Sequence, residues 1–184
     1  MSETIALIDF GAGNLHSVHN ALMAAGAGNV AVTADPVMVA QADRIILPGV
    51  GAFGACRDAL FAIDGMIDAV EQRVRKDGVP FLGICVGMQM LADKGIEYGA
   101  HDGLGWIGGT PTAGHELLES GEAYYLHGYH FDVADEADIL ATTSHGGSLV
   151  AAVGRDNIVG VQFHPEKSQA YGLAFLQQFL EWKP

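Results

Sequence analysis

The stretch Phe81-Leu-Gly-Ile-Cys-Val-Gly-Met-Gln89 places a cysteine between two glycines directly after a short apolar run. The run follows Pro80, and the apolar residues Met90 and Leu91 come directly after the quoted stretch. We therefore expect a strand that ends at the cysteine and a helix that begins immediately after it. This is the thiol version of the G-x-S-x-G elbow, in which the nucleophile sits on a strained turn and flanking side chains larger than glycine would collide.

The chain before this elbow alternates apolar runs with helical stripes. Three short runs are apolar apart from Asp9 and Arg44 and do not alternate with polar residues, as expected of strands that are covered on both faces. They are residues 5–10, 30–32 and 44–47. Two sets of apolar residues recur at helical spacing: Leu15, Val18 and Leu22, which precede Gly26, and Ile63, Ile67, Val70 and Val74. This alternation predicts an α/β fold with a parallel sheet.

The pattern changes after residue 122, where strand candidates follow one another closely. These candidates are residues 123–126, 129–133, 139–142, 149–153 and 158–163. The dipeptide Asp156-Asn157 supplies a turn between the last two, so we expect hairpins, and Leu173, Leu176 and Leu180 predict a final helix. We therefore predict one domain, residues 1–184, with a three-layer α/β fold whose central, mostly parallel sheet carries an antiparallel extension.

Composition and charge exclude several classes of protein. Of the 184 residues, 49% are hydrophobic and 17% charged, the reverse of the balance in disordered chains. The formal net charge is −13, whereas a protein that binds nucleic acid or anionic membranes usually carries an excess of positive charge. The chain has 2 cysteines, no basic region before its first apolar stretch, and no apolar run near the roughly 18 residues of a membrane span. We expect a cytoplasmic protein without disulfides.

Cys85 is the candidate nucleophile. A helix N-terminus lowers the pKa of a nearby thiol and points backbone N–H groups at developing negative charge, which favours acyl chemistry. A lone cysteine is more often a buried structural residue, but the two glycines and the apolar strand favour the nucleophile here. Cys56 has no comparable setting, and we interpret it as structural.

A thiolate nucleophile needs a residue that carries protons, and His164 is the candidate among the eight histidines. Pro165 biases His164 toward extended backbone, and residues i and i+2 of an extended segment face the same way. Glu166 can therefore orient the imidazole, which predicts a triad in which Cys85 is the nucleophile, His164 the general acid–base and Glu166 the orienting carboxylate. The other histidines fit a solvated helix face, opposite faces of a strand, or loops.

Donors for an oxyanion are expected in the loop Pro48-Gly-Val-Gly51, because open α/β sheets bind ligands at the carboxyl ends of their strands. A peptide N–H of this loop would act together with that of Val86, although such a loop is more often only a turn. The loop Gly11-Ala-Gly-Asn14 resembles a phosphate cradle, but it lacks the third glycine and the downstream acid of the dinucleotide fingerprint.

Three segments, in this order along the chain, resemble the class I (triad-type) glutamine amidotransferases. They are Pro48-Gly-Val-Gly-Ala-Phe53, Leu82-Gly-Ile-Cys-Val-Gly-Met-Gln89 and Gln162-Phe-His-Pro-Glu-Lys-Ser168. Three others are similar to the glutaminase-subunit family of imidazole glycerol phosphate synthase, in histidine biosynthesis: Asp9-Phe-Gly-Ala-Gly-Asn-Leu15, Ala141-Thr-Thr143 and Ala151-Ala-Val153. The resemblance extends over nearly the whole chain and implies a flavodoxin-like, three-layer fold.

The resemblance implies hydrolysis of glutamine to glutamate and ammonia through a γ-glutamyl thioester. The site residues that it implies are the triad Cys85, His164 and Glu166, backbone oxyanion donors at Val50, Gly51 and Val86, glutamine-binding side chains Gln89 and Glu97, and partner contacts Asn14 and Lys167. The implied partner is a cyclase subunit with a (β/α)₈ barrel, which forms a heterodimer and receives the ammonia. That subunit forms imidazole glycerol phosphate and an aminoimidazole carboxamide ribotide. Neither a metal nor an organic cofactor is implied.

The chain departs from the family pattern between Trp106 and Gly121. The family carries a longer segment there, with a Pro-His-Met-Gly-Trp-Asn strand motif, whereas only residues 110–120 fill the space here. The segment His127-Gly-Tyr129 also carries glycine where the family often has serine or threonine. Two alternatives therefore stay open: a stand-alone thiol hydrolase of a related α/β fold, and a non-catalytic regulatory partner of the barrel subunit.

Overall fold

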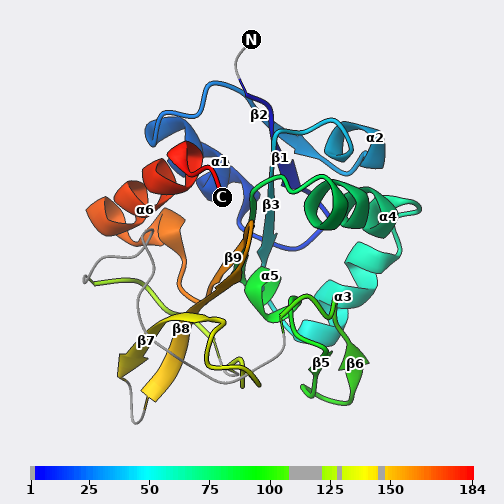
Figure 1. The fold of residues 1–184 in the computed structure, drawn as a ribbon, viewed down its shortest axis with the longest axis vertical. Helices are drawn as coiled ribbons and strands as arrows, with labels where there is room; N and C mark the ends of the chain where they lie inside the picture. The colour runs from blue at the N-terminus through cyan, green and yellow to red at the C-terminus, as the bar shows by residue number, and fades with distance from the viewer. Residues whose placement is uncertain (1–2, 108–121, 128–129, 145–147) are drawn as a thin grey trace.

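A computed structural model describes residues 3–107, 122–127, 130–144 and 148–184 of the chain (Figure 1). Seven strands form one sheet in the order β2-β1-β3-β4-β9-β8-β7. Their bounds are β1 (Ile5–Ile8), β2 (Val30–Thr33), β3 (Arg44–Gly49), β4 (Phe81–Cys85), β7 (Ile139–Ser144), β8 (Ser148–Arg155) and β9 (Ile158–Val161).

The first five strands in this order run parallel, and β8 and β7 continue the sheet in antiparallel pairing. Every residue of β1, β3, β4 and β9 is buried. Burial on both faces explains why the sequences of these strands are continuous apolar runs. The prediction of a mostly parallel sheet with an antiparallel extension is confirmed.

Helices cover both faces of the sheet and complete three layers (Figure 1). On one face α1 (Leu15–Ala24) packs against α6 (Gln169–Glu181), and on the other lie α2 (Pro36–Val39), α3 (Phe53–Phe61) and α4 (Met66–Val70). The single turn α5 (Val86–Gln89) follows β4, and a 3-10 turn (Pro165–Lys167) precedes α6. Among the described residues, no helix is both long enough and apolar enough to cross a membrane.

Two predicted strands do not form. Residues 123–126 and the described part of 129–133 have no sheet pairing, and Tyr129 lies outside the described residues. The backbone of Tyr124 instead bonds to the segment after β9: its N–H donates to Oγ of Ser168 at 2.9 Å, and its carbonyl accepts the N–H of His164 at 2.9 Å. Because one of these partners is a side chain, a strand ladder does not continue there.

The predicted helical stripe at residues 63–74 is interrupted. Ile63 lies in the turn between α3 and α4, and Gly65, with a φ of 75°, starts a new helix at Met66. The helix then continues as π-helical turns over Glu71–Lys76. The left-handed backbone at the glycine resets the helical phase, so the residues of the stripe do not share one helix.

The helix after the elbow is shorter than the apolar pattern indicated. It ends at Gln89, because the next carbonyls accept hydrogen bonds from a later loop: the N–H of Leu104 donates to Met90 at 2.7 Å, and that of Trp106 donates to Leu91 at 2.9 Å. A short antiparallel pair that the sequence pattern did not indicate, β5 (Lys94–Gly95) with β6 (His101–Asp102), lies between these partners.

Candidate active site

Cys85 sits at the junction of β4 and α5 with a backbone φ of 56°, a left-handed conformation that residues other than glycine seldom adopt. The glycines on either side permit the close packing that holds it. A Cβ at Gly83 would lie 2.6 Å from the carbonyl oxygen of Gly87, and a Cβ at Gly87 would overlap the carbonyl of Leu47 in β3. The turn α5 therefore packs directly over β3 and β4, and this packing holds the backbone of Cys85 in its strained conformation.

His164 and Glu166 form a buried pair after β9, the strand next to β4. Nδ1 of His164 lies 2.9 Å from Oε1 of Glu166, and the two side chains are 2% and 1% exposed. The backbone at His164 is extended, with φ −99° and ψ 98°, but Pro165 and Glu166 lie in a 3-10 turn. The contact that the sequence predicted is therefore present, but the expected extended geometry over residues 164–166 is wrong: the turn brings the carboxylate to the ring. Because Nδ1 is bonded to Glu166, Nε2 is the imidazole nitrogen that can interact with the thiol.

The pKa of His164 is raised by its neighbours. Burial disfavours the imidazolium and acts to lower the pKa, but hydrogen bonding and the charges of Cys85 and Glu166 outweigh it and raise the pKa from 6.5 to about 9. Nε2 of His164 and Oε2 of Glu166 have no hydrogen-bond partner of standard geometry within the described ranges. A buried imidazole nitrogen beside a thiol, without a competing partner, is suited to exchange a proton with the reacting groups.

A small pocket opens beside the thiol, lined by Gly51, Cys85, Val86, Gln89, Glu97, Leu126 and His127. The first five are residues that the sequence singled out. Oε2 of Glu97 accepts the N–H of Phe53 at 2.8 Å, which holds the carboxylate at the start of α3. A carboxylate suits the ammonium group of an amino acid, and a carboxamide both donates and accepts hydrogen bonds. Within the described ranges, no group of three or more His, Cys, Asp or Glu residues is placed to hold a metal ion.

Leu126 and His127 line this pocket although sequence reasoning did not include them among the site residues. Both belong to the extended segment that bonds to the loop after β9 through Tyr124. The only local signal is the departure from the family pattern at the next residue, Gly128. Their place in the pocket depends on a contact between segments about forty residues apart, which periodicity does not encode.

The expected oxyanion loop is only half a loop: Pro48 and Gly49 still pair with β4 at the end of β3, and Val50 and Gly51 follow the strand. Gly51 has a φ of 111°, and a Cβ at Gly49 would lie 2.8 Å from the backbone nitrogen of Gly87. The carbonyl of Val50 accepts a hydrogen bond from Sγ of Cys56 at 3.4 Å, which ties the loop to α3. Cys56 is itself buried, and burial raises the pKa of its thiol. Of the three expected donors, Gly51 and Val86 line the pocket and Val50 does not.

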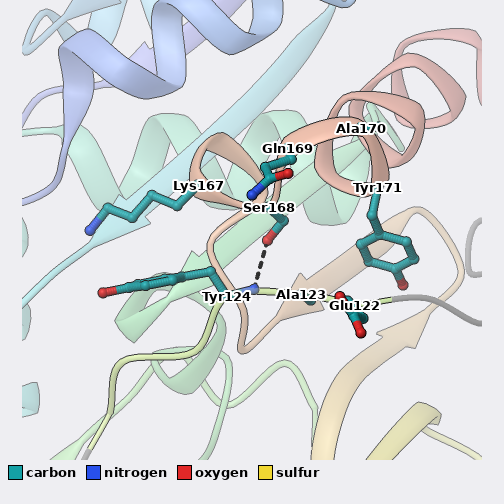
Figure 2. Close-up of a pocket in the computed structure, with 8 residues that line it drawn as sticks. All are labelled: Glu122, Ala123, Tyr124, Lys167, Ser168, Gln169, Ala170 and Tyr171. Carbon is teal, nitrogen blue, oxygen red and sulfur yellow. Dashed lines mark hydrogen bonds between the residues drawn. The ribbon is translucent and has the colours of Figure 1, made fainter.

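The expected partner contacts, Asn14 and Lys167, lie away from this pocket. Asn14 precedes α1 and Lys167 ends the 3-10 turn before α6, and these two elements contact each other. Figure 2 shows Lys167 over the ring of Tyr124, with Nζ 5.3 Å from the ring centre, at a second pocket that residues 122–124 and 167–171 line. Neither Cys85 nor His164 lines that pocket, so we assign the chemistry to the smaller one.

A three-layer α/β fold with a strained cysteine before a one-turn helix is typical of one class of enzymes. The chain belongs to this class, the class-I glutamine amidotransferases, whose family model matches residues 6–182. Within this class it is similar to the imidazole glycerol phosphate synthase subunit HisH of Zymomonas mobilis. The two are 57% identical over 208 aligned positions, covering 100% of this chain and 98% of the relative. The same subunit of Rhodospirillum rubrum is 47% identical, with 98% of this chain and 99% of the relative covered.

Solved structures share the fold. A glutamine amidotransferase superimposes with a TM-score of 0.71 at 18% identity, covering 97% of this chain and 99% of the other. PurLQS from Thermotoga maritima gives 0.68 at 18% identity, covering 98% of each. The alignments with the two HisH subunits span 208 and 212 positions against 184 residues, so these relatives carry residues that this chain lacks. Residues 110–120, which fill the space where the sequence indicated a shortening, lie outside the described residues.

Proposed function

We propose that this chain is the glutaminase subunit of imidazole glycerol phosphate synthase, which hydrolyses glutamine and passes the ammonia to a cyclase subunit. One observation carries the chemistry: the thiol of Cys85 shares a pocket with Gln89 and Glu97, while the buried His164–Glu166 pair follows β9, the strand next to the one that ends at the cysteine. The choice of substrate and partner is supported by the similarity to the HisH subunits.

Recognition of glutamine uses the polar side chains of the pocket. The carboxylate of Glu97 would pair with the α-ammonium group of the substrate, and its bond to the Phe53 N–H keeps it in place without the substrate. The carboxamide of Gln89 would bond the α-carboxylate or the side-chain amide. These contacts would direct the δ-carbonyl of glutamine at Sγ of Cys85, with backbone N–H groups of the oxyanion loop and Val86 facing the oxygen.

Two proton transfers complete the reaction. Sγ of Cys85 attacks the amide carbon, an S–C bond forms, and His164 gives its proton to the departing nitrogen as the C–N bond breaks and ammonia leaves. Water then attacks the γ-glutamyl thioester, His164 takes a proton from it, and the S–C bond breaks to release glutamate. Glu166 holds the imidazole in the correct orientation and stabilises the imidazolium in both steps.

The proposed partner is a cyclase subunit with a (β/α)₈ barrel, bound as a heterodimer. The net charge of −13 favours a partner surface that carries basic residues. Asn14 directly precedes α1 and Lys167 ends the 3-10 turn, and the contact between these two elements supports a shared docking surface. The two cysteines are free, which is compatible with the proposed cytoplasmic location.

The test is turnover of glutamine by the purified chain, alone and then with a cyclase subunit of imidazole glycerol phosphate synthase and its nucleotide ligand. We expect stimulation by the complex and loss of glutamine-dependent synthesis in Cys85→Ala. The same variant should leave cyclisation with ammonium salts intact, because the cyclase then receives ammonia from solution.

Robust turnover without the partner would indicate a stand-alone hydrolase instead. Absence of turnover in both states, with a folded complex, would indicate a non-catalytic partner of the barrel subunit. Loss of ammonium-dependent cyclisation in Cys85→Ala would contradict the role assigned to the thiol.

A further inference from the structure

Gln162, a residue outside the proposed triad, lies just after β9 with a completely buried side chain. Its exposed fraction is 0%, and its backbone N–H donates to the carbonyl of Ala151 in β8 at 2.9 Å. In the parallel pair β4 and β9, Ile84 lies opposite Val161, so the next residues along the two strands are Cys85 and Gln162. The sheet therefore brings the carboxamide next to the nucleophile.

The carboxamide of Gln162 bridges two residues of the candidate site. Its Nε2 donates to Sγ of Cys85 at 3.8 Å. Its Oε1 accepts an N–H from Nε2 of Gln89 at 3.1 Å. Gln89 is 8% exposed and lines the pocket together with the thiol. The amide of Gln162 thus lies between the sulfur and a side chain that faces the substrate.

The chemistry of these groups sets the direction of both hydrogen bonds. The NH₂ end of the Gln162 amide faces the sulfur and its oxygen faces Gln89, and an amide N–H is a donor that suits a sulfur acting as an acceptor. Gln89 must then present an N–H to that oxygen, which defines the orientation of its own amide. Hydrogen bonds to ionised groups are about twice as strong as neutral ones, and a buried donor without a partner is costly.

We propose that Gln162 is a positioning residue, whose carboxamide holds the sulfur of Cys85 by a hydrogen bond and orients Gln89 toward glutamine. The identity of the substrate rests on the proposed function, whereas the contact with the sulfur does not. The titratable groups around the sulfur are His164 and Glu166 after β9, Glu97 and His127 in the pocket, and Cys56 on α3. Gln162 adds a neutral donor to this set.

Two substitutions separate the hydrogen bonds from the volume of the side chain. Gln162→Met keeps a similar volume and removes both donor and acceptor, whereas Gln162→Glu keeps the shape and replaces the donor with a negative charge. Gln41→Glu is the matched control, because it makes the same change in charge at an exposed position after α2. All three proteins are first compared by thermal unfolding.

The first measurement is the rate of alkylation of Cys85 by iodoacetamide across a range of pH, followed by the mass of the Cys85 peptide in the free chain without glutamine. We expect at least a 10-fold slower reaction at neutral pH in Gln162→Met, a larger loss in Gln162→Glu, and a profile displaced to higher pH in both. Gln41→Glu should match the wild type. A purely structural role predicts the opposite, because loosened packing exposes the thiol and speeds its alkylation.

The second measurement is glutamine turnover in the complex with the cyclase subunit. We expect Gln162→Met to raise the KM for glutamine as well as lower kcat, and to have little further effect on KM in a Gln89→Ala background. Alkylation profiles equal to that of the wild type would overturn the proposal. A wild-type complex without glutaminase activity, combined with alkylation that depends on Gln162, would overturn the proposed function and leave the positioning role standing.

A third measurement uses the wild-type protein, so it does not depend on whether a Gln162 variant folds. The side-chain NH₂ resonances of Gln162 should move with pH at the midpoint of the alkylation profile, and should not do so in Cys85→Ala. Resonances that stay fixed while the alkylation rate changes would show that the amide does not contact the sulfur, and would overturn the proposal.

Discussion

Oε1 of Glu166 accepts a hydrogen bond from Nδ1 of His164 at 2.9 Å, and the two side chains are 1% and 2% exposed. This contact defines which imidazole nitrogen is available to the substrate. With Nδ1–H held by the carboxylate, Nε2 is the nitrogen that would exchange protons with the thiol and the leaving group in the proposed mechanism. The buried pair therefore links the chain geometry after β9 to the catalytic roles proposed for the site.

Glu166→Gln is expected to lower kcat for glutamine on the order of 100-fold or more, because a neutral amide neither stabilises the imidazolium nor favours the Nδ1–H tautomer. The measurement is steady-state glutamine turnover in the complex with the cyclase subunit. Glu181→Gln, the same change at the exposed end of α6, is the control. Equal kcat values for the two variants would contradict the orienting role.

The raised pKa of His164 predicts a pH dependence of stability. A group whose pKa is raised from 6.5 to about 9 on folding stabilises the native state fully below pH 6.5, and this contribution is lost as the pH rises through about 9. The free energy of unfolding should therefore fall over this window more steeply in the wild type than in His164→Gln. Urea unfolding at several pH values measures it. In the control His16→Gln, an exposed change on α1, the slope should stay as in the wild type.

Activity should fall on the alkaline side for the same reason. Above about pH 9 His164 loses the proton that, in the proposed mechanism, it gives to the departing nitrogen. We expect kcat/KM for glutamine in the complex to decrease above this pH, whereas cyclisation with added ammonia should not show the same decrease. A flat glutamine profile through pH 10 would contradict the assignment of His164 as the general acid.

Glu97→Gln is expected to raise the KM for glutamine roughly 10-fold or more with a smaller effect on kcat, since a charge-assisted hydrogen bond to the α-ammonium group is lost. The amide oxygen can still accept the N–H of Phe53, so the temperature of unfolding should change little. Initial rates over a series of glutamine concentrations measure the two constants. The control is Asp93→Asn, the same kind of change at a nearby exposed position. An unchanged KM in Glu97→Gln would show that Glu97 does not bind the substrate.

Gly51→Ala tests the oxyanion loop against a matched glycine. Gly51 and Gly78 both have positive φ, 111° and 74°, and a Cβ added at either position would meet no atom within 4 Å. Alanine at either position should therefore cost about 1–2 kcal/mol of stability through backbone strain. Only Gly51→Ala should also lower kcat in the complex, because only Gly51 lines the pocket. A comparable loss of kcat in Gly78→Ala would show that the lower kcat of Gly51→Ala comes from lost stability alone.

Local sequence was enough to predict the elbow and the parallel strands. Glycines at 83 and 87 are required by close backbone packing, and a continuous apolar run is what burial on both faces of a parallel strand demands. The contact between His164 and Glu166 was also predicted from their spacing, although a 3-10 turn that begins at Pro165, rather than extended backbone, makes it. Each of these features depends on dihedral angles and burial within a single element, and a residue pattern reports both directly.

The tertiary structure alone decided which distant segments meet. It brings Glu97, Leu126 and His127 into the pocket of Cys85, sets Gln162 beside the sulfur, and makes residues 123–126 a loop partner rather than a strand. These contacts join segments tens of residues apart, and their free energies come from the packing of the whole sheet and its helices. No local periodicity encodes that sum, so the sequence determined which residues we propose as nucleophile and acid–base pair, while the fold determined which side chains surround them.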